Sequence, residues 1–168
     1  MNRARIFTLT ALIIALSGCA AKTRYIEPSP TAPRARLSID ARTVKLISGF
    51  ATVDIVAGPS RCGEAYPDSK RAIVISQGNP LISSINAEGI WVSADQPIHL
   101  VTMMGMDGFS CGQALTFTPN AGEDYHLQAV GQSSFNRYVA PTCKVQVVSY
   151  SASTTSEAAV STPLACVR

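Results

Sequence analysis

Short runs of β-branched and aromatic residues recur along most of the chain, and turn residues separate them at roughly ten-residue intervals. Helical periodicity is almost absent after residue 16. About seven or eight short strands at this spacing predict an all-β fold, an antiparallel β-sandwich. The expected strands cover residues 43–58, 71–76, 80–86, 89–94, 97–104, 111–119, 123–131 and 143–151.

Strict alternation supports this interpretation in the second half of the chain. In residues 123–130, Tyr125, Leu127 and Ala129 fall on one face of a strand, and polar residues occupy the positions between them. A period of two is typical of a sheet with one face on the core and one face in water.

The apolar run near the start of the chain is of a different kind. Residues 6–16, "IFTLTALIIAL", follow two basic residues, Arg3 and Arg5, and have no polar face. The run is shorter than the roughly 20 apolar residues of a transmembrane helix. Basic, apolar and small-residue regions in this order are the features of a secretory signal peptide, which we expect to cover residues 1–18.

The sequence "LSGC" at residues 16–19 resembles the bacterial lipobox at all four positions. The resemblance implies cleavage between Gly18 and Cys19, a diacylglycerol on the Cys19 sulfur and an acyl chain such as palmitate on the new amino terminus. Ala20 follows, and no Asp stands at the second mature position. The resemblance therefore implies a lipoprotein of the bacterial outer membrane, anchored through Cys19 and facing the periplasm.

Three segments follow the expected cleavage site. Residues 19–36 contain the lipidated cysteine and three prolines, and we expect an extended tether that reaches roughly 55 Å when fully stretched. Residues 37–150 form the β-sandwich domain. Residues 151–168 are rich in Ser, Thr and Ala, a composition that favours disorder up to Leu164.

Charge narrows the possible partners. The chain has 14 Lys and Arg against 11 Asp and Glu, and two of the basic residues lie in the expected signal peptide. The mature chain is then nearly neutral, and it has no aromatic-basic array, so we expect no nucleic-acid partner. Basic residues are concentrated before residue 46, where they either contact anionic lipid head groups or belong to a solvated linker.

Four cysteines remain after Cys19, and an even number in an exported domain predicts two disulfides. They are Cys62, Cys111, Cys143 and Cys166. No Cys-x-x-Cys pair occurs, so we expect neither a zinc site nor another bound metal.

A turn sequence, "FTPNAGEDYHLQ" at residues 117–128, is similar to the F-x-P-x-x-G-x-x-Y hairpin of several small proteobacterial lipoproteins with transthyretin-like or immunoglobulin-like β-sandwiches. Cys111 and Cys143 match the cysteines that flank that hairpin. In a simple meander one strand would separate them by about 9.6 Å, beyond the roughly 7 Å limit of a disulfide. The pairings 111–143 with 62–166 and 62–111 with 143–166 both stay open.

Common catalytic motifs are absent from the sequence. His99 and His126 each fall inside an expected strand, where a histidine on the polar face is usually solvated. We expect no catalytic residue among them. The carboxylates that could form a glycosidase pair sit at turns, where such residues are common: Asp95, Asp107, Glu123 and Asp124.

Two further features each allow a ligand-binding interpretation and a purely structural one. The sequence "MMGMDG" at residues 103–108 is either a copper(I) site or a core strand that ends in a loop. No His or Cys stands at ligand spacing, so we expect no cofactor. The sole tryptophan, Trp91, is expected to be a core anchor rather than a binding platform.

These features together predict a non-enzymatic module that docks an envelope partner, either a protein or peptidoglycan. An exposed apolar or edge-strand patch would favour this function. The first alternative is an enzyme with a site assembled from loops, such as a cell-wall hydrolase, which would need His99 or His126 beside a carboxylate in a cleft. The second is an accessory lipoprotein of type VI secretion, which is also a transthyretin-like sandwich.

Overall fold

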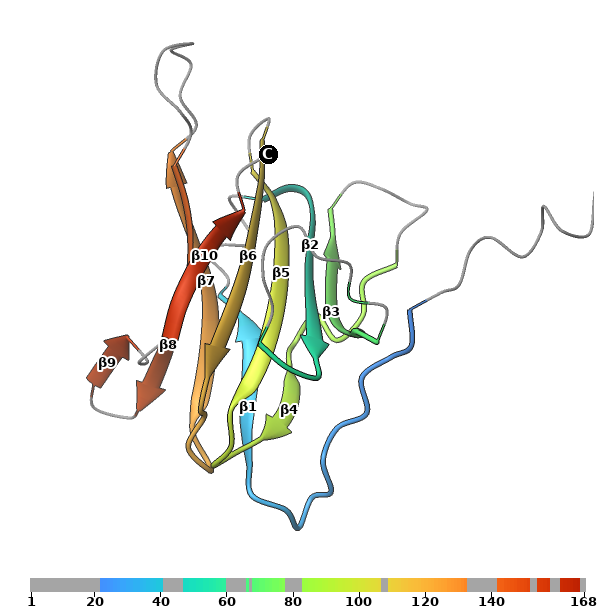
Figure 1. Ribbon diagram of the computed structural model, residues 1–168, viewed down its shortest axis with the longest axis vertical. Coiled ribbons are helices and arrows are strands. Elements are labelled where there is room, and N and C mark those ends of the chain that lie inside the picture. Colours follow the sequence, from blue (N-terminus) through green and yellow to red (C-terminus); the bar gives the residue numbers. More distant parts are fainter. Residues whose placement is uncertain are drawn as a thin grey trace, which may run out of the picture.

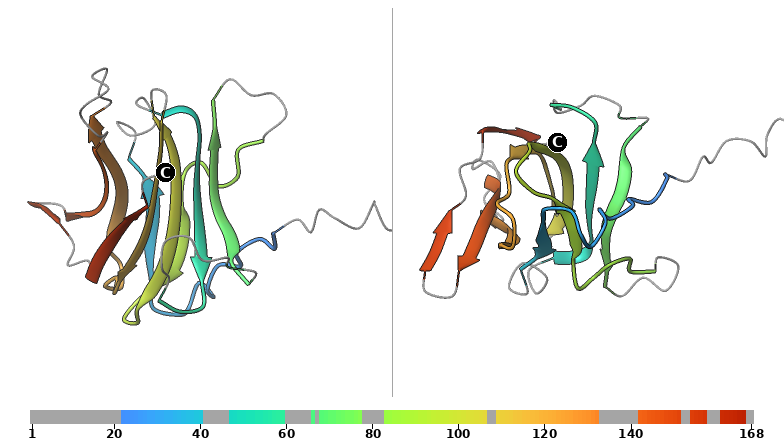
Figure 2. Two further views of the ribbon diagram at one scale, coloured as in Figure 1. Left: turned by 45° about the horizontal axis from the view of Figure 1, so that its top comes forward. Right: turned by 90° about the horizontal axis from the view of Figure 1, so that it is seen from below.

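A computed structural model describes residues 22–40, 47–59, 66, 68–77, 83–106, 109–132, 142–151, 154–157 and 161–166. Within these residues the secondary structure is all β. The two sheets face each other in two layers, as the view from below in Figure 2 shows. The prediction of a mostly antiparallel β-sandwich is therefore confirmed.

Each sheet has five strands, and we name each after its first strand in the chain. The β1 sheet contains, in spatial order, β4 (Ile90–Ser93), β1 (Arg34–Ile39), β7 (Asp124–Gln132), β8 (Thr142–Ser151) and β9 (Thr154–Glu157). The β2 sheet contains β10 (Ser161–Cys166), β6 (Phe109–Phe117), β5 (Ile98–Met106), β2 (Ile47–Val56) and β3 (Lys70–Ser76). Figure 1 shows the β2 sheet in front and the β1 sheet behind it.

The core lies between the two sheets and is built by the alternating positions of each strand. Leu37, Val53, Leu100, Leu127 and Val147 are completely buried, and they come from strands of both sheets. Because side chains alternate across a strand, the polar residues between these positions face outward. The alternation expected for residues 123–130 is confirmed, since Tyr125 and Ala129 are also buried.

Gln113 on β6 is a polar residue inside this core, and it links the two sheets. Its backbone carbonyl accepts a hydrogen bond of 3.1 Å from the buried Thr102 hydroxyl on β5. Its side-chain Oε1 accepts a hydrogen bond from the backbone N–H of Val145 on β8, across the space between the sheets. A buried amide is stable only when it finds such partners, so Gln113 holds β6 and β8 in one relative position.

Three expectations about strand positions were wrong. β1 begins at Arg34, inside the segment 19–36 that we expected to be a tether. β9 and β10 lie in the Ser/Thr-rich tail, because an added edge strand needs backbone hydrogen bonds rather than large apolar side chains. The segment 80–86 is no strand in its described part, residues 83–86. There Ile85 forms an isolated β-bridge with Val74 of β3. The next strand along the chain, β4, pairs with β1.

The turn after β6 also differs from the expected hairpin. Gly122 has a positive φ of 81°, and the Tyr125 hydroxyl accepts a 3.0 Å hydrogen bond from the backbone N–H of Asn120. The turn chemistry is as expected, but β6 belongs to the β2 sheet and β7 to the β1 sheet. The turn therefore carries the chain from one sheet to the other.

Gly89, just before β4, is the glycine most tightly constrained by its surroundings. Its φ of +108° is unfavourable for any residue with a side chain, and an added Cβ would lie 2.7 Å from the Leu37 carbonyl oxygen. Gly49 has a similar φ of +112° but nothing within 4 Å of the corresponding position. A comparison of substitutions at these two glycines therefore distinguishes the cost of backbone strain from the cost of steric overlap.

We expect Gly49→Ala to lower the free energy of unfolding by about 1–3 kcal/mol through strain alone. Gly89→Ala adds an overlap with the backbone of β1, and we expect it to cost at least roughly 1 kcal/mol more. Urea denaturation of the two variants measures the difference. Equal destabilisation would contradict the close approach of residue 89 to β1.

The arrangement of strands bears on the disulfides. β7 runs opposite to β6 in Figure 1, and β8 is antiparallel to β7, so β6 and β8 run in the same direction. Cys111 and Cys143 each stand two residues before the linked pair, Gln113 and Val145. The meander geometry that disfavoured their pairing does not apply, because the two strands lie in facing sheets.

The register also bears on Cys166. Its backbone pairs with that of Gly112 on β6, the residue after Cys111. Cys62 lies outside the described residues. We therefore predict a 111–143 disulfide, with 62–166 as the second.

Peptide mapping of the purified chain under non-reducing conditions tests this pairing, and we expect a fragment that joins residues 111 and 143. Replacing both cysteines by Ser should cost about 2–5 kcal/mol of stability, the usual effect of losing a native disulfide. A fragment that joins 62 to 111 would contradict the prediction.

Candidate functional site

Residues 22–27 form an N-terminal arm that binds to the edge of the β2 sheet. The backbone N–H of Arg71 on β3 donates to the Thr23 carbonyl (2.8 Å), and the N–H of Tyr25 donates to the Arg71 carbonyl (2.9 Å). These two bonds make a parallel bridge between Arg24 and Arg71. The described part of the expected spacer thus lies along the domain and is not free.

The arm then crosses from the β2 sheet to the edge of the β1 sheet. The Glu27 carboxylate accepts a 3.1 Å hydrogen bond from the backbone N–H of Trp91 on β4. Between these contacts the Tyr25 ring packs partly buried against the core. Burial raises the pKa of the Tyr25 hydroxyl above its usual value, and the Glu27 carboxylate raises it further. The arm covers the side of the sandwich where β3 and β4 would otherwise be open (Figure 1).

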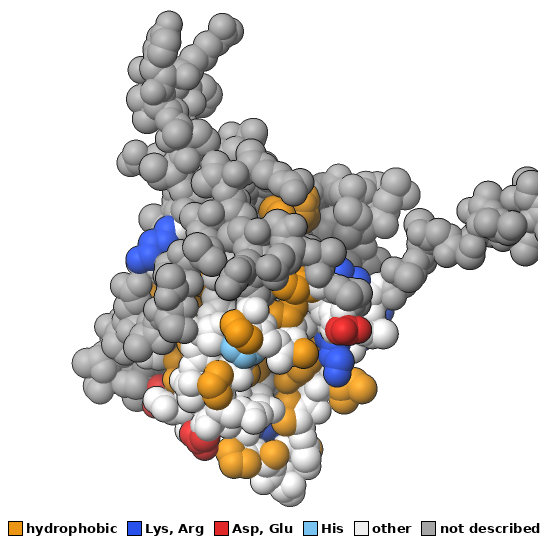
Figure 3. All heavy atoms as spheres, viewed as in Figure 1, with side chains coloured by type: hydrophobic (Ala, Val, Ile, Leu, Met, Phe, Trp, Pro, Cys, Tyr) orange, Lys and Arg blue, Asp and Glu red, His pale blue; other side chains and the backbone are white. Residues whose placement is uncertain are grey.

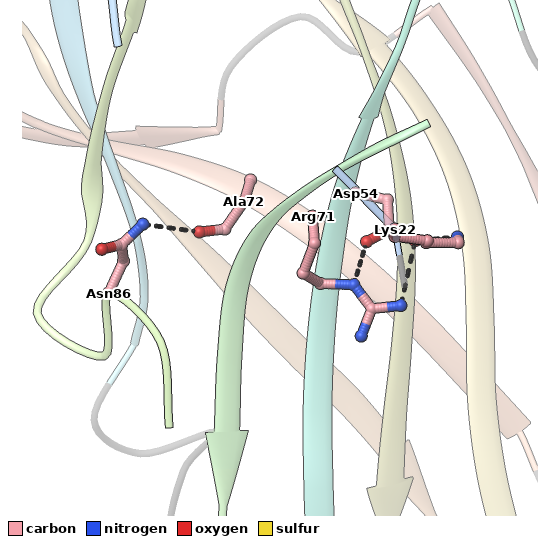
Figure 4. Close-up of polar contacts among 5 residues, drawn as sticks. All are labelled: Lys22, Asp54, Arg71, Ala72 and Asn86. Atoms are coloured by element: carbon pink, nitrogen blue, oxygen red, sulfur yellow. Dashed lines mark hydrogen bonds and ion pairs between the residues drawn. The ribbon is translucent and has the colours of Figure 1, made fainter. Parts of the chain in front are cut away.

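An ion-pair cluster fixes the start of the arm. Asp54 on β2 is only 5% exposed, and its carboxylate binds two cations. Lys22 Nζ lies 2.5 Å from Asp54 Oδ2, and Arg71 Nε pairs with Oδ1. Arg71 Nη2 also donates to Oδ2 over 3.5 Å. Burying a carboxylate is costly without partners of opposite charge, and Figure 4 shows the two cations converging on Asp54.

A second segment covers the same edge strand further along. Asn86 Nδ2 donates to the Ala72 carbonyl over 2.9 Å, as Figure 4 also shows. The backbones of Val74 and Ile85 exchange two hydrogen bonds of 2.9 Å each. Uncovered edge strands invite pairing with other chains, and the arm and residues 83–86 together prevent this at β3.

The cluster makes a direct prediction for stability. Asp54→Asn removes the charge that holds Lys22 and Arg71, and we expect a loss of about 1–3 kcal/mol, the usual cost of breaking a buried charge-assisted contact. Amide hydrogen exchange at residues 23–27 should become faster, because the arm loses its attachment. The matched control is Asp68→Asn, an exposed carboxylate just before β3, which should change stability by less than about 0.5 kcal/mol. Unchanged exchange in the arm of the Asp54 variant would contradict the role of the cluster.

The outer face of the β2 sheet is apolar around the middle of β5. Phe50 and Met103 are each 38% exposed, and Val101 is half-buried beside them. Figure 3 views this side of the molecule and shows hydrophobic side chains on it, with a histidine among them. Met103 therefore points away from Met104, which is fully buried in the core. The two do not form one thioether site, and Asp107 lies outside the described residues.

The outer face of the β1 sheet is polar instead. The Ser38 hydroxyl and His126 Nδ1 share a 2.9 Å hydrogen bond between β1 and β7, the one parallel pair among the described strands. One step along, Gln128 Nε2 donates to Asp40 Oδ2 over 3.1 Å. On the edge strand β4, Trp91 stacks under the Arg34 guanidinium, 4.2 Å from the ring centroid.

Trp91 thus corrects an expectation. Its neighbours Ile90 and Val92 are buried, so the tryptophan points outward and is only half-buried. The core-anchor interpretation was wrong, because the strand's alternation places residue 91 on the outer face. Trp and Arg in a stacked, partly exposed pair are typical of protein-binding surfaces.

Each histidine shares a hydrogen bond with a hydroxyl group on a neighbouring strand. His99 Nδ1 lies 2.8 Å from Thr116 Oγ1 across β5 and β6, and His126 Nδ1 lies 2.9 Å from the hydroxyl of the buried Ser38. The Ser38–His126 pair is within reach for a nucleophile and its base. However, β1 pairs with β4 over residues 34–37 and with β7 over residues 36–39, and Ser38 is only 8% exposed. A polymeric substrate therefore has little access to its hydroxyl.

Carboxylates and cysteines are placed as follows. Asp95 has a positive φ of 60° at the turn after β4, Glu123 precedes β7, and Asp124 is exposed at its start. Gly18, Cys19 and Cys62 lie outside the described residues. In the described part of the chain, no three His, Cys, Asp or Glu side chains come together as metal ligands. No helix among the described residues is long and apolar enough to cross a membrane.

Comparison with known proteins adds no further identification: no protein family, no curated protein and no solved structure matches the chain. The arm and its cluster carry no motif that marks them in the sequence. Lys22, Asp54 and Arg71 are up to 49 positions apart and become neighbours only through the sheet.

Proposed function

We propose that this chain is a lipid-anchored, periplasm-facing lipoprotein whose β-sandwich docks an envelope partner without catalysing a reaction. One observation carries the proposal. The lipobox cysteine, Cys19, stands three residues before Lys22, where the arm is bound to the domain by an ion pair. The expected cleavage site is thus followed closely by a contact that fixes the chain to the domain. A chain so arranged presents a compact domain at the lipid surface.

The partner surface we propose is the outer face of the β1 sheet near Trp91 and Arg34. It combines a stacked aromatic–guanidinium pair with the polar side chains of β1 and β7. Aromatic and Arg side chains of this kind contribute most of the binding energy in many protein interfaces. We take the partner to be an envelope protein; peptidoglycan is the alternative that the experiment distinguishes.

In-cell crosslinking of a C-terminally tagged chain, followed by mass spectrometry, tests the proposal. We expect one envelope protein to be enriched with the lipidated chain and lost with Cys19→Ser, which also leaves the membrane fraction. Trp91→Ala should reduce the capture roughly tenfold or more, the effect of removing a hot-spot side chain of about 1.4 kcal/mol. The exposed Asp68→Ala is the matched control and should capture as wild type does.

Two results would overturn parts of the proposal. A Cys19→Ser chain that fractionates with membrane as wild type does would remove the anchor. Capture of wall fragments alone would replace the protein partner by peptidoglycan, and capture of type VI secretion components would favour the accessory-lipoprotein alternative.

The Ser38–His126 pair is the observation that favours an enzyme, and it has its own test. A hydrolase that used this pair would lose its activity in Ser38→Ala. We expect neither wild type nor Ser38→Ala to release fragments from purified peptidoglycan, because the Ser38 side chain is buried. Release that depends on Ser38 would establish the enzyme instead.

A further inference from the structure

The docked arm sets how far the domain can stand from its lipid anchor. This inference rests on the proposed lipidation of Cys19. Cys19 and Lys22 are three positions apart, and fully extended chain covers at most about 3.6 Å per residue, so the two Cα atoms are within roughly 11 Å. The 55 Å reach expected of a free spacer is not available while the arm is docked. The part of the domain around Lys22 must then lie at the bilayer surface.

We propose that the outer face of the β2 sheet around Asp54, bearing Phe50 and Met103, rests on a bilayer surface that contains anionic lipid. Phe50, Thr52 and Asp54 alternate along one face of β2, and Thr52 pairs with Met103 on β5. Same-face neighbours along a strand are about 6.6–6.8 Å apart, so both apolar side chains start within roughly 14 Å of Asp54. Lys22 binds Asp54 directly, which brings the acylated end of the chain beside them.

Charge on this side suits anionic head groups. The arm and the neighbouring strand β3 bring Lys22, Arg24 and Arg71 together on this side. The nearby carboxylates are Asp54, which is already paired, and the exposed Asp68 before β3, while Glu27 of the arm reaches across to Trp91. Each basic residue near an anionic membrane contributes about 1 kcal/mol of attraction. Exposed apolar side chains bordered by basic ones are typical of surfaces that lie in the lipid interface.

The same orientation turns the polar β1 sheet toward the periplasm. The two outer faces point in opposite directions, because the core lies between the sheets (Figure 2). The native Trp91 therefore reports on the side away from the lipid, and Met103 marks the side toward it.

The test uses the purified, lipidated full chain in vesicles of phosphatidylethanolamine and phosphatidylglycerol that contain a brominated lipid as quencher. The double variant W91F/M103W moves the single tryptophan to the proposed lipid face, and the wild-type chain is its matched control. We expect bromine to quench the variant's emission roughly twofold or more beyond that of wild type, because interfacial side chains enter the bilayer by about 5–10 Å. A thermal melt of the variant verifies that it folds.

A second variant tests the charge. Arg24→Glu, combined with W91F/M103W, should reduce the quenching in phosphatidylglycerol vesicles and leave it unchanged in phosphatidylcholine vesicles. Arg24 is exposed and lies outside the ion-pair cluster, so the fold should be kept.

The outcomes separate this inference from the proposed function. A chain that does not float with vesicles refutes the anchor, and with it both proposals. A chain that floats through Cys19 but shows equal quenching at positions 91 and 103 keeps the anchor and overturns the orientation. Quenching that is unaffected by Arg24→Glu overturns the contribution of anionic lipid.

Discussion

The structure depends on one buried carboxylate. Asp54 stands on the outer face of β2, where an uncompensated charge would be costly once other groups cover it. Arg71 on the neighbouring strand supplies one cation and Lys22 on the arm supplies the other. The same arrangement that neutralises Asp54 also brings the arm to the edge of β3, where its backbone completes the hydrogen bonding of that strand. A charge requirement and an edge-strand requirement are thus met by a single six-residue segment, residues 22–27.

The sandwich itself follows from alternation, and its connections follow from where the chain changes sheets. β6 leads through the Pro119–Gly122 turn into the opposite sheet, and Gln113 spans the core between β6 and β8. β1 is an inner strand of its sheet, between β4 and the parallel strand β7. The two outer faces of the sandwich differ in character, since the β2 sheet exposes apolar side chains such as Met103 and the β1 sheet carries hydrogen-bonded polar pairs such as Ser38–His126. That difference gives the domain two sides suited to different surroundings.

The sequence allowed the long alternating strands to be predicted, because each carries its own signal of burial in residues such as Leu115 and Leu127. It did not reveal β1, where arginines and nearby prolines obscured the inward row that contains Leu37. The tail strands were missed because pairing with β8 and β6 stabilises them through the backbone. The outward side of Trp91 was missed because tryptophan is usually a core residue. The arm could not be predicted at all, since Asp54 and Lys22 meet only after the sheet has formed.

The docked arm also gives the segment before β1 two possible lengths, a short one while the arm is bound and a longer one after it detaches. A force that pulls an anchored Cys19 away from the domain acts first on Lys22 and then on the two backbone bonds at Arg71, which open one after the other. Each such bond contributes only about 1 kcal/mol in water, so this attachment is weak compared with the sandwich behind it. Once the arm has detached, the chain between Cys19 and the start of β1 at Arg34 can extend to roughly 50 Å before β1 bears load. Under tension the domain can therefore move further from Cys19 than it can while the arm is bound.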